Sequence, residues 1–135
     1  MKYILDTNII SAILKGNEEV KNKVDDAISN EDEILINGIC YYEIKRGLLS
    51  LNATRKLKKF QSFCEVFGLV LLDSKEIFDE ASNIHVNLKR MGRLTKDDAD
   101  ILIASITKTL DAILVTANTR DFENIQGLTF ENWID

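Results

Sequence analysis

Short apolar runs alternate along the chain with stretches in which apolar residues recur every three or four positions. The short runs predict buried β-strands, and the wider spacing predicts amphipathic helices. Strands are expected at 2–5, 33–36, 69–72 and 112–116, with a fifth at 128–130 on the edge of the sheet. Helices are expected at 7–15, 17–29, from Asn37 to about Leu51, 54–67, from Ser74 through Arg90, and 97–110, with a loop at 92–96.

This alternation predicts an α/β fold with a mainly parallel central sheet of four to five strands, flanked by helices on both faces. The length of 135 residues suits one domain with its own core, and the chain has no proline and only six glycines. We therefore expect a single domain spanning 1–135. Ligands of such folds bind at the carboxyl ends of the strands, so a functional site is expected at that edge.

Four carboxylates stand at the ends of apolar runs that are far apart in the chain: Asp6, Glu43, Asp100 and Asp121. Each has an ordinary structural explanation, as a helix cap, a partner of a helix dipole or a turn residue. After the first strand, however, Thr7 and Asn8 add two polar groups where one cap would suffice. If the strand ends meet, the acids meet as well, and such a cluster needs a bound cation.

Carboxylate oxygens are ligands that suit Mg²⁺ or Mn²⁺, and such ions can activate water for attack on a phosphodiester. Other hydrolytic sites lack their residues. His85 is the only histidine, which excludes an acid and base pair of histidines, and no Gly-x-Ser-x-Gly motif is present. Cys40 and Cys64 are too far apart in sequence for a zinc motif, and are expected to be buried thiols in a reducing compartment.

The formal net charge of −5 argues against a nucleic-acid partner when taken alone. Positive charge is nevertheless gathered in two places. The segment 45–59 has six basic residues and no acid, and a second group follows at 89–96. These groups are either solvated helical faces or arms that bind phosphate. The chain shows neither a signal-peptide pattern nor about 20 consecutive apolar residues, so we expect a cytoplasmic protein with no membrane contact.

The acids lie within longer motifs that resemble those of PIN-domain ribonucleases, and among these the VapC toxins of bacterial or archaeal toxin–antitoxin pairs. The matching stretches appear in family order and span essentially the whole chain. They are Leu5-Asp6-Thr7-Asn8-Ile9-Ile10-Ser11, Tyr42-Glu43-Ile44-Lys45-Arg46-Gly47, Asp100-Ile101-Leu102-Ile103-Ala104-Ser105, Val115-Thr116-Ala117-Asn118-Thr119-Arg120-Asp121-Phe122, Gly127-Leu128 and Glu131-Asn132-Trp133.

The resemblance implies that Asp6, Glu43 and Asp100 are catalytic and bind the metal, with Asp121 as a fourth and more variable acid. Thr7 and Asn118 are implied as polar supports. The chain departs from the family in having Asn37-Gly38 where a Ser or Thr is usual, and 95–99 where a proline is common. It stays open whether Asp98 shares the work of Asp100. The basic residues expected to contact RNA are Lys45, Arg46, Arg93 and Arg120.

The resemblance further implies a metal-dependent endoribonuclease that acts on RNA, forms a homodimer and is neutralised by a VapB-like antitoxin. An Arg or Lys of the antitoxin could pair with the acids, and the second and fourth predicted helices could offer it an apolar groove. Two alternatives remain. One is a non-catalytic binding module with the PIN fold. The other is a phosphatase of the haloacid-dehalogenase type, which needs a second Asp where this chain has Asn8.

Overall fold

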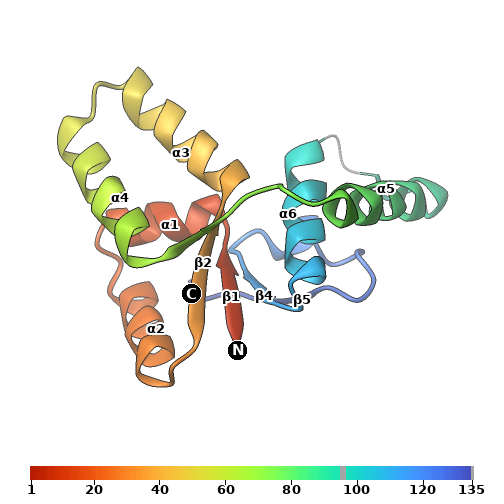
Figure 1. Cartoon of the computed structure of the whole chain (residues 1–135), viewed down its shortest axis with the longest axis horizontal. Coiled ribbons are helices and arrows are strands. Elements are labelled where there is room, and N and C mark those ends of the chain that lie inside the picture. Colours follow the sequence, from red (N-terminus) through yellow and green to blue (C-terminus); the bar gives the residue numbers. More distant parts are fainter. Residues whose placement is uncertain (95–96, 135) are drawn as a thin grey trace.

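A computed structural model describes residues 1–94 and 97–134 of the chain. The elements in order are β1 (Lys2–Leu5), α1 (Thr7–Leu14), α2 (Glu18–Ser29), β2 (Glu33–Asn37), α3 (Gly38–Ser50), α4 (Thr54–Val66), β3 (Gly68–Val70), α5 (Lys75–Arg90), α6 (Asp98–Thr109), β4 (Ile113–Val115), the 3₁₀ turn η1 (Thr119–Asp121) and β5 (Thr129–Glu131) (Figure 1). Every predicted helix and strand is present. The predicted loop at 92–96 lies partly outside the described residues, and so does Lys96 of the second basic group.

The third strand begins and ends earlier than predicted. It pairs with β2 from Leu35↔Gly68 to Asn37↔Val70, and β2 ends at Asn37. Leu71 and Leu72 therefore have no strand residue of β2 to pair with, although they continue the apolar run. The turn η1 was not predicted, because its residues carry no apolar periodicity.

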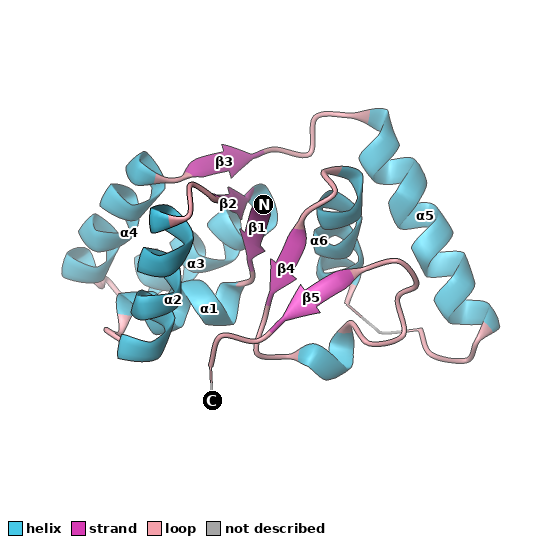
Figure 2. Ribbon diagram, turned by 90° about the horizontal axis from the view of Figure 1, so that it is seen from below, coloured by secondary structure: helices cyan, strands magenta, loops and turns pink. Residues whose placement is uncertain are grey.

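The sheet has the order β3-β2-β1-β4-β5, and all four pairs of neighbouring strands are parallel. Helices α1 to α4 connect β1 to β2 and β2 to β3, and they lie on one side of the sheet, whereas α5 and α6 lie on the other (Figures 1 and 2). The predicted α/β fold is therefore confirmed. The chain order reverses direction between β1 and β4, and ligands of open parallel sheets bind at such a switch point.

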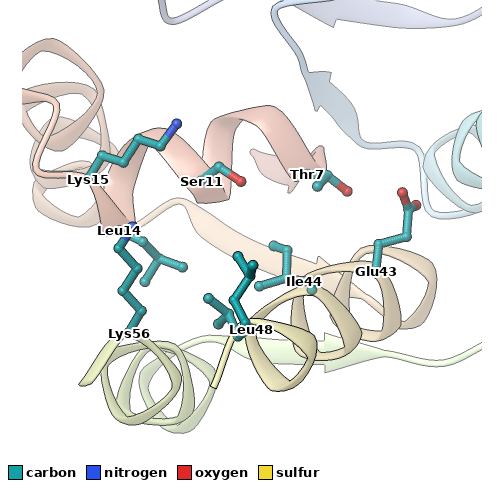
Figure 3. Close-up of a pocket in the computed structure, with 10 residues that line it drawn as sticks. Thr7, Ser11, Leu14, Lys15, Glu43, Ile44, Leu48 and Lys56 are labelled. Atoms are coloured by element: carbon teal, nitrogen blue, oxygen red, sulfur yellow. The ribbon is translucent and has the colours of Figure 1, made fainter. Parts of the chain in front are cut away.

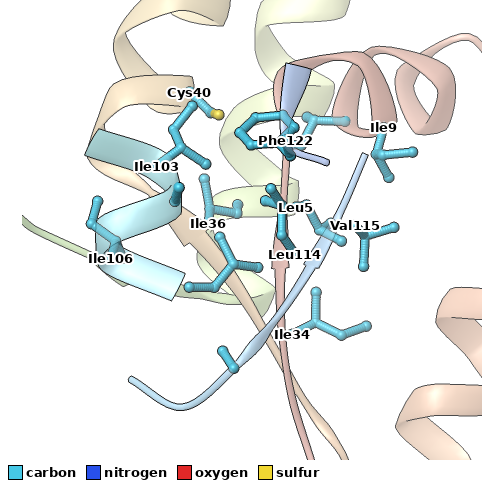
Figure 4. Close-up of a cluster of buried hydrophobic side chains, with 14 of the residues drawn as sticks. Leu5, Ile9, Ile34, Ile36, Cys40, Ile103, Ile106, Leu114, Val115 and Phe122 are labelled. Atoms are coloured by element: carbon cyan, nitrogen blue, oxygen red, sulfur yellow. The ribbon is translucent and has the colours of Figure 1, made fainter. Parts of the chain in front are cut away.

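The core consists of apolar side chains from both sides of the central strands (Figure 4). Leu5 and Leu114 are fully buried in adjacent strands, and α6 contributes Ile103 and Ile106. Six residues of α6 are buried, as expected for an apolar central helix. Because α6 is fixed in this way, its first turn is held at the sheet edge. Among the described residues, no helix is long and apolar enough to cross a membrane.

Candidate active site

Asp6 stands at the end of β1 and is the N-cap of α1, so the ordinary explanation of this acid is correct. Its Oδ1 accepts a hydrogen bond from the Thr7 backbone N at 2.8 Å. A cap uses one oxygen, but here both are engaged. Oδ2 accepts from Thr116 Oγ1 at 2.8 Å and from Asn8 Nδ2 at 3.4 Å. The Asp6 side chain is only 5% exposed, so these donors and not bulk water hold the carboxylate in place.

The loop after β4 is tied to the start of α1 across the switch point. Thr116 Oγ1 accepts from the Asn118 backbone N at 3.0 Å, and Asn8 Oδ1 accepts from the Ala117 backbone N at 2.9 Å. Thr116 is fully buried. Asn118 therefore supports this site through its backbone, and Asn8 has a structural duty. The loop carries Asp121, which is exposed in η1.

Glu43 lies in α3, about one turn after the helix begins. Asn37, where this helix was expected to begin, is its N-cap, since its Oδ1 accepts from the Cys40 backbone N at 3.0 Å. The pKa of Glu43 is raised, first by burial and then by the negative charges of Asp6 and Asp97, while the positive charge of Arg46 lowers it. Glu43 therefore lies within electrostatic reach of acids from two other elements.

The pKa of Asp100 responds to the charges of the other acids at this edge of the sheet. Its pKa is raised to about 7, first by burial and then by the negative charges of Asp97, Asp6, Asp121 and Glu43, in that order. These acids come from β1, α3, α6 and the loop after β4, so the structure brings all four predicted acids to one edge of the sheet.

Asp97 is an additional acid at this edge. It caps α6 by accepting from the Ala99 backbone N at 2.9 Å. Asp98 is exposed and is not among the charges that raise the pKa of Asp100. The acid whose charge raises the pKa of Asp100 most is therefore Asp97, which was not singled out from the sequence.

Among the residues that the structure describes, the acid cluster is open and does not form a closed cage of protein ligands. In residues 1–94 and 97–134, no group of three His, Cys, Asp or Glu side chains is close enough to hold an ion by itself. Mg²⁺ keeps several waters and is usually bound through one or two carboxylates plus substrate phosphates, so it does not need a closed cage. The donor chemistry fits, because the converging groups are carboxylates that repel one another. Thr7 Oγ1 is also buried there and makes no hydrogen bond of standard geometry.

The predicted RNA-binding residues differ in position. Arg46 lies beside Glu43, and its guanidinium is 5.1 Å from the ring centre of Tyr42. Lys45 instead donates to the Tyr41 hydroxyl at 3.3 Å and lowers the pKa of Cys64, so it is directed toward α4. The other two are exposed in loops: Arg93 after α5 and Arg120 in η1.

A groove of about 240 Å³ opens beside Glu43. Figure 3 shows Glu43 and Thr7 at one end, Lys15 and Lys56 at the other, and apolar side chains between them. Those apolar residues are Leu14, Ile44, Leu48 and Leu51.

The groove is formed by α1, α3 and α4. The apolar groove expected from the second and fourth helices stays a prediction, and Ile28 of α2 and Val66 of α4 line a separate hollow. The apolar residues of α2, Val20, Val24 and Ala27, are already buried in the core. The amphipathic pattern of α2 was read correctly, but its apolar face is covered.

A model of the PIN domain family matches residues 3–128. This chain belongs to the PIN domain family. Ribonuclease VapC2 of Rickettsia felis is 30% identical over 141 residues, and Ribonuclease VapC1 of Haemophilus influenzae (strain R2866) is 28% identical over 135 residues. Each alignment covers 98% of both proteins. The crystal structure of VapBC2 from Rickettsia felis, bound to a DNA fragment from their promoter, contains a chain that matches with a TM-score of 0.91, at 26% identity over 99% of this chain and 100% of that one.

Three residues of this PIN domain site were not singled out from the sequence: Asp97, Cys40 and Thr116. The Cys40 thiol donates to Asp6 Oδ1 at 3.7 Å, and burial raises its pKa to about 12, so it stays protonated. Cys40 was expected only as a buried thiol. Thr116 was seen as the end of a strand. The signal that would have found both is the sheet order, which places their elements on either side of β1.

We predict that Asp100→Asn stabilises the metal-free PIN domain above about pH 4. The pKa of Asp100 is about 7 in the folded chain and near 3.8 when unfolded, so the folded state retains the proton more strongly. The wild-type carboxyl therefore loses its favourable contribution as the pH rises from about 4 to about 7, where the loss is complete. Urea unfolding with chelator at several pH values measures this.

Asp98→Asn is the matched control, because Asp98 lies in the same first turn of α6 and shares its helix-dipole environment. We expect a gain at pH 8 that disappears below about pH 4 for Asp100→Asn, and a small change for Asp98→Asn. Equal gains in the two variants would contradict the convergence of the acids on Asp100.

Proposed function

We propose that this PIN domain is an endoribonuclease of the VapC kind, the toxin of a VapBC-type toxin–antitoxin pair, and that it hydrolyses RNA phosphodiester bonds with Mg²⁺ or Mn²⁺. The observation that carries the proposal is the raised pKa of Asp100, which results first from burial and then from the charges of acids that come from three other elements at the switch point of the sheet. The relatives that match over almost their whole length are named ribonucleases.

Asp6, Glu43 and Asp100 would hold the ion, with Asp121 as the outermost acid. When bound, the ion lowers the pKa of a coordinated water and stabilises the charge that develops on the phosphate. Asp6 contributes a carboxylate whose direction is already set by Thr116, Asn8 and the Thr7 backbone. This preorganisation reduces the ordering that binding would otherwise require.

Asp100 couples cation binding to protons. With a pKa of about 7 it is partly protonated at neutral pH in the absence of a cation. Occupation by a divalent ion requires the carboxylate form, so binding should release a proton and weaken as the pH falls below 7. The charge of the cluster is thus adjusted by a proton or by a metal ion.

The RNA would reach the cluster past Arg46, which lies beside Glu43 and can neutralise a phosphate. Arg93 and Arg120 are exposed and are proposed to hold the backbone farther from the cleaved bond. Lys45 is a weaker candidate than the sequence suggested, because its ammonium contacts Tyr41. RNA binding would then depend on these few arginines and not on the net charge of the chain, which is −5.

Of the two alternatives considered from the sequence, the non-catalytic PIN-fold module remains and the haloacid-dehalogenase phosphatase does not. A non-catalytic PIN-fold module would share every feature of the fold described above, so only an activity measurement separates it. The haloacid-dehalogenase alternative is replaced by the PIN domain match. In addition, Asn8, at the position where that class needs an Asp, is occupied in bonding Asp6 and Ala117.

We predict that the purified chain cuts RNA in Mn²⁺ or Mg²⁺ and that a chelator stops it. Asp6→Asn, Glu43→Gln and Asp100→Asn should each lower the cleavage rate ~100-fold or more, a magnitude typical of groups that stabilise developing charge. Sequencing of the new RNA ends gives the cleavage sites.

Asp111→Asn is the matched control, because Asp111 is exposed just beyond the opposite end of α6. Its backbone φ of 52° is one that Asn adopts readily, so the fold should not change. A wild type that is folded but inert toward RNA in both ions would favour the non-catalytic module.

The groove between α1, α3 and α4 is proposed as the docking site of a VapB-like antitoxin. Its apolar floor suits one face of an amphipathic helix, and its ends differ in charge. An Arg or Lys of the partner would lie at the Glu43 end, where it could also pair with the neighbouring acids. An acidic residue would lie near Lys15 and Lys56.

We predict that Leu51→Asp weakens inhibition by a VapB-like antitoxin at least ~10-fold while RNA cleavage is retained. Leu51 lines the groove but is 79% exposed, so the charge should not disturb folding. Ile28→Asp, at a half-exposed position outside the groove, is the control. The concentration of antitoxin that halves cleavage is measured for all three proteins, and equal values would move the docking site elsewhere.

The homodimer and the cytoplasmic location stay predictions. The exposed apolar side chains of Phe78 and Val86 on α5 are a candidate contact between two copies.

A further inference from the structure

Asn37, the last residue of β2, makes more contacts than its role as a helix cap requires. Its side chain is fully buried. Oδ1 accepts from the Cys40 backbone N at 3.0 Å, which is the cap bond. Nδ2 is directed toward two further acceptors, the Leu5 carbonyl oxygen at 3.4 Å and Cys40 Sγ at 3.2 Å.

These contacts connect Asn37 to the elements that carry Asp6 and Glu43. Leu5 is the residue directly before Asp6, and Leu5↔Ile36 is the last backbone pair between β1 and β2. The Asn37 amide therefore continues the connection between the two strands where their backbone pairing stops. Cys40 Sγ in turn donates to Asp6 Oδ1 at 3.7 Å. The bond from the Cys40 backbone N to Asn37 fixes the start of α3, and Glu43 follows Cys40 by three residues in this helix.

The contacts of Asn37 oppose the electrostatic repulsion between Asp6 and Glu43. Asp6 and Glu43 repel each other, since the charge of Asp6 contributes to the raised pKa of Glu43. They stand on separate elements, so repulsion alone would move α3 away from the end of β1. Groups that orient metal ligands in this way typically change metal affinity or activity by about 10- to 100-fold when they are removed.

We propose that Asn37 is a positioning residue that sets the separation of Asp6 and Glu43 and so the metal affinity of the acid cluster. This inference rests on the function proposed above. Asn37 does not touch the ion or the RNA. It acts through Leu5, Cys40 and the first turn of α3.

The test is Asn37→Ser, because Ser is as good a helix cap as Asn but lacks the second arm that reaches Leu5. Mn²⁺ binding is measured by electron paramagnetic resonance of the free ion, without RNA, together with thermal unfolding in chelator. We expect Mn²⁺ affinity to fall about 10-fold or more, with a cooperative unfolding transition retained.

Asn17→Ser is the matched control. Asn17 caps α2 through the same kind of bond, from the Val20 backbone N to Oδ1 at 3.1 Å, and α2 carries none of the four acids. Its Mn²⁺ affinity should stay within about twofold of wild type. A folded Asn37→Ser protein that binds Mn²⁺ as wild type does would overturn the positioning role.

A second pair of variants keeps the proposal falsifiable if Asn37→Ser does not fold. Cys40→Ala removes the thiol between Asn37 and Asp6, whereas Cys40→Ser retains a donor. We expect weaker Mn²⁺ binding in Cys40→Ala than in Cys40→Ser, and equal binding would overturn the proposal. A wild type that neither binds Mn²⁺ nor cuts RNA would overturn the proposed metal site itself, which is a distinguishable result.

Discussion

Repulsion among carboxylates is the constraint on which the rest of the site depends. Burial and, after it, the negative charges of four other acids together raise the pKa of Asp100 to about 7. Like charges gathered at one edge of a sheet cost free energy, so the fold must hold them there by other means. Two means are visible: the buried α6 fixes Asp100, and four donors fix Asp6.

The sheet order makes this gathering possible. Because β1 lies between β2 and β4, Asp6 has the loop of β4 on one side and the start of α3 on the other. Thr116 reaches Asp6 from the first side, and Cys40 reaches it from the second. The same arrangement leaves a groove that ends at Glu43. Substrate and partner binding are thus both proposed at the same edge of the sheet, at the switch point between β1 and β4.

The local parts of this structure were predictable from the sequence, because strands, helices and caps depend on neighbouring residues. The alternating apolar runs predicted every helix and strand of the described residues apart from the 3₁₀ turn η1, and Asp6 and Asn37 were placed at helix starts. The choice of Asp97 over Asp98 could not be predicted, since it depends on the residue at which α6 begins. Thr116 was missed because only the sheet order brings β4 beside β1. The groove beside Glu43 was not predicted, because amphipathicity does not reveal which apolar faces are already covered.

The most direct measurement of the central claim is thermal unfolding of the wild type and of Asp6→Asn, each with chelator and with Mn²⁺. A ligand that binds only the folded state must stabilise it, by about 2.7 kcal/mol at a hundred times its dissociation constant. Convergent acids that need a cation predict that Mn²⁺ raises the unfolding temperature of the wild type and leaves that of Asp6→Asn nearly unchanged. Equal effects of Mn²⁺ on the two proteins, or none on either, would contradict the account.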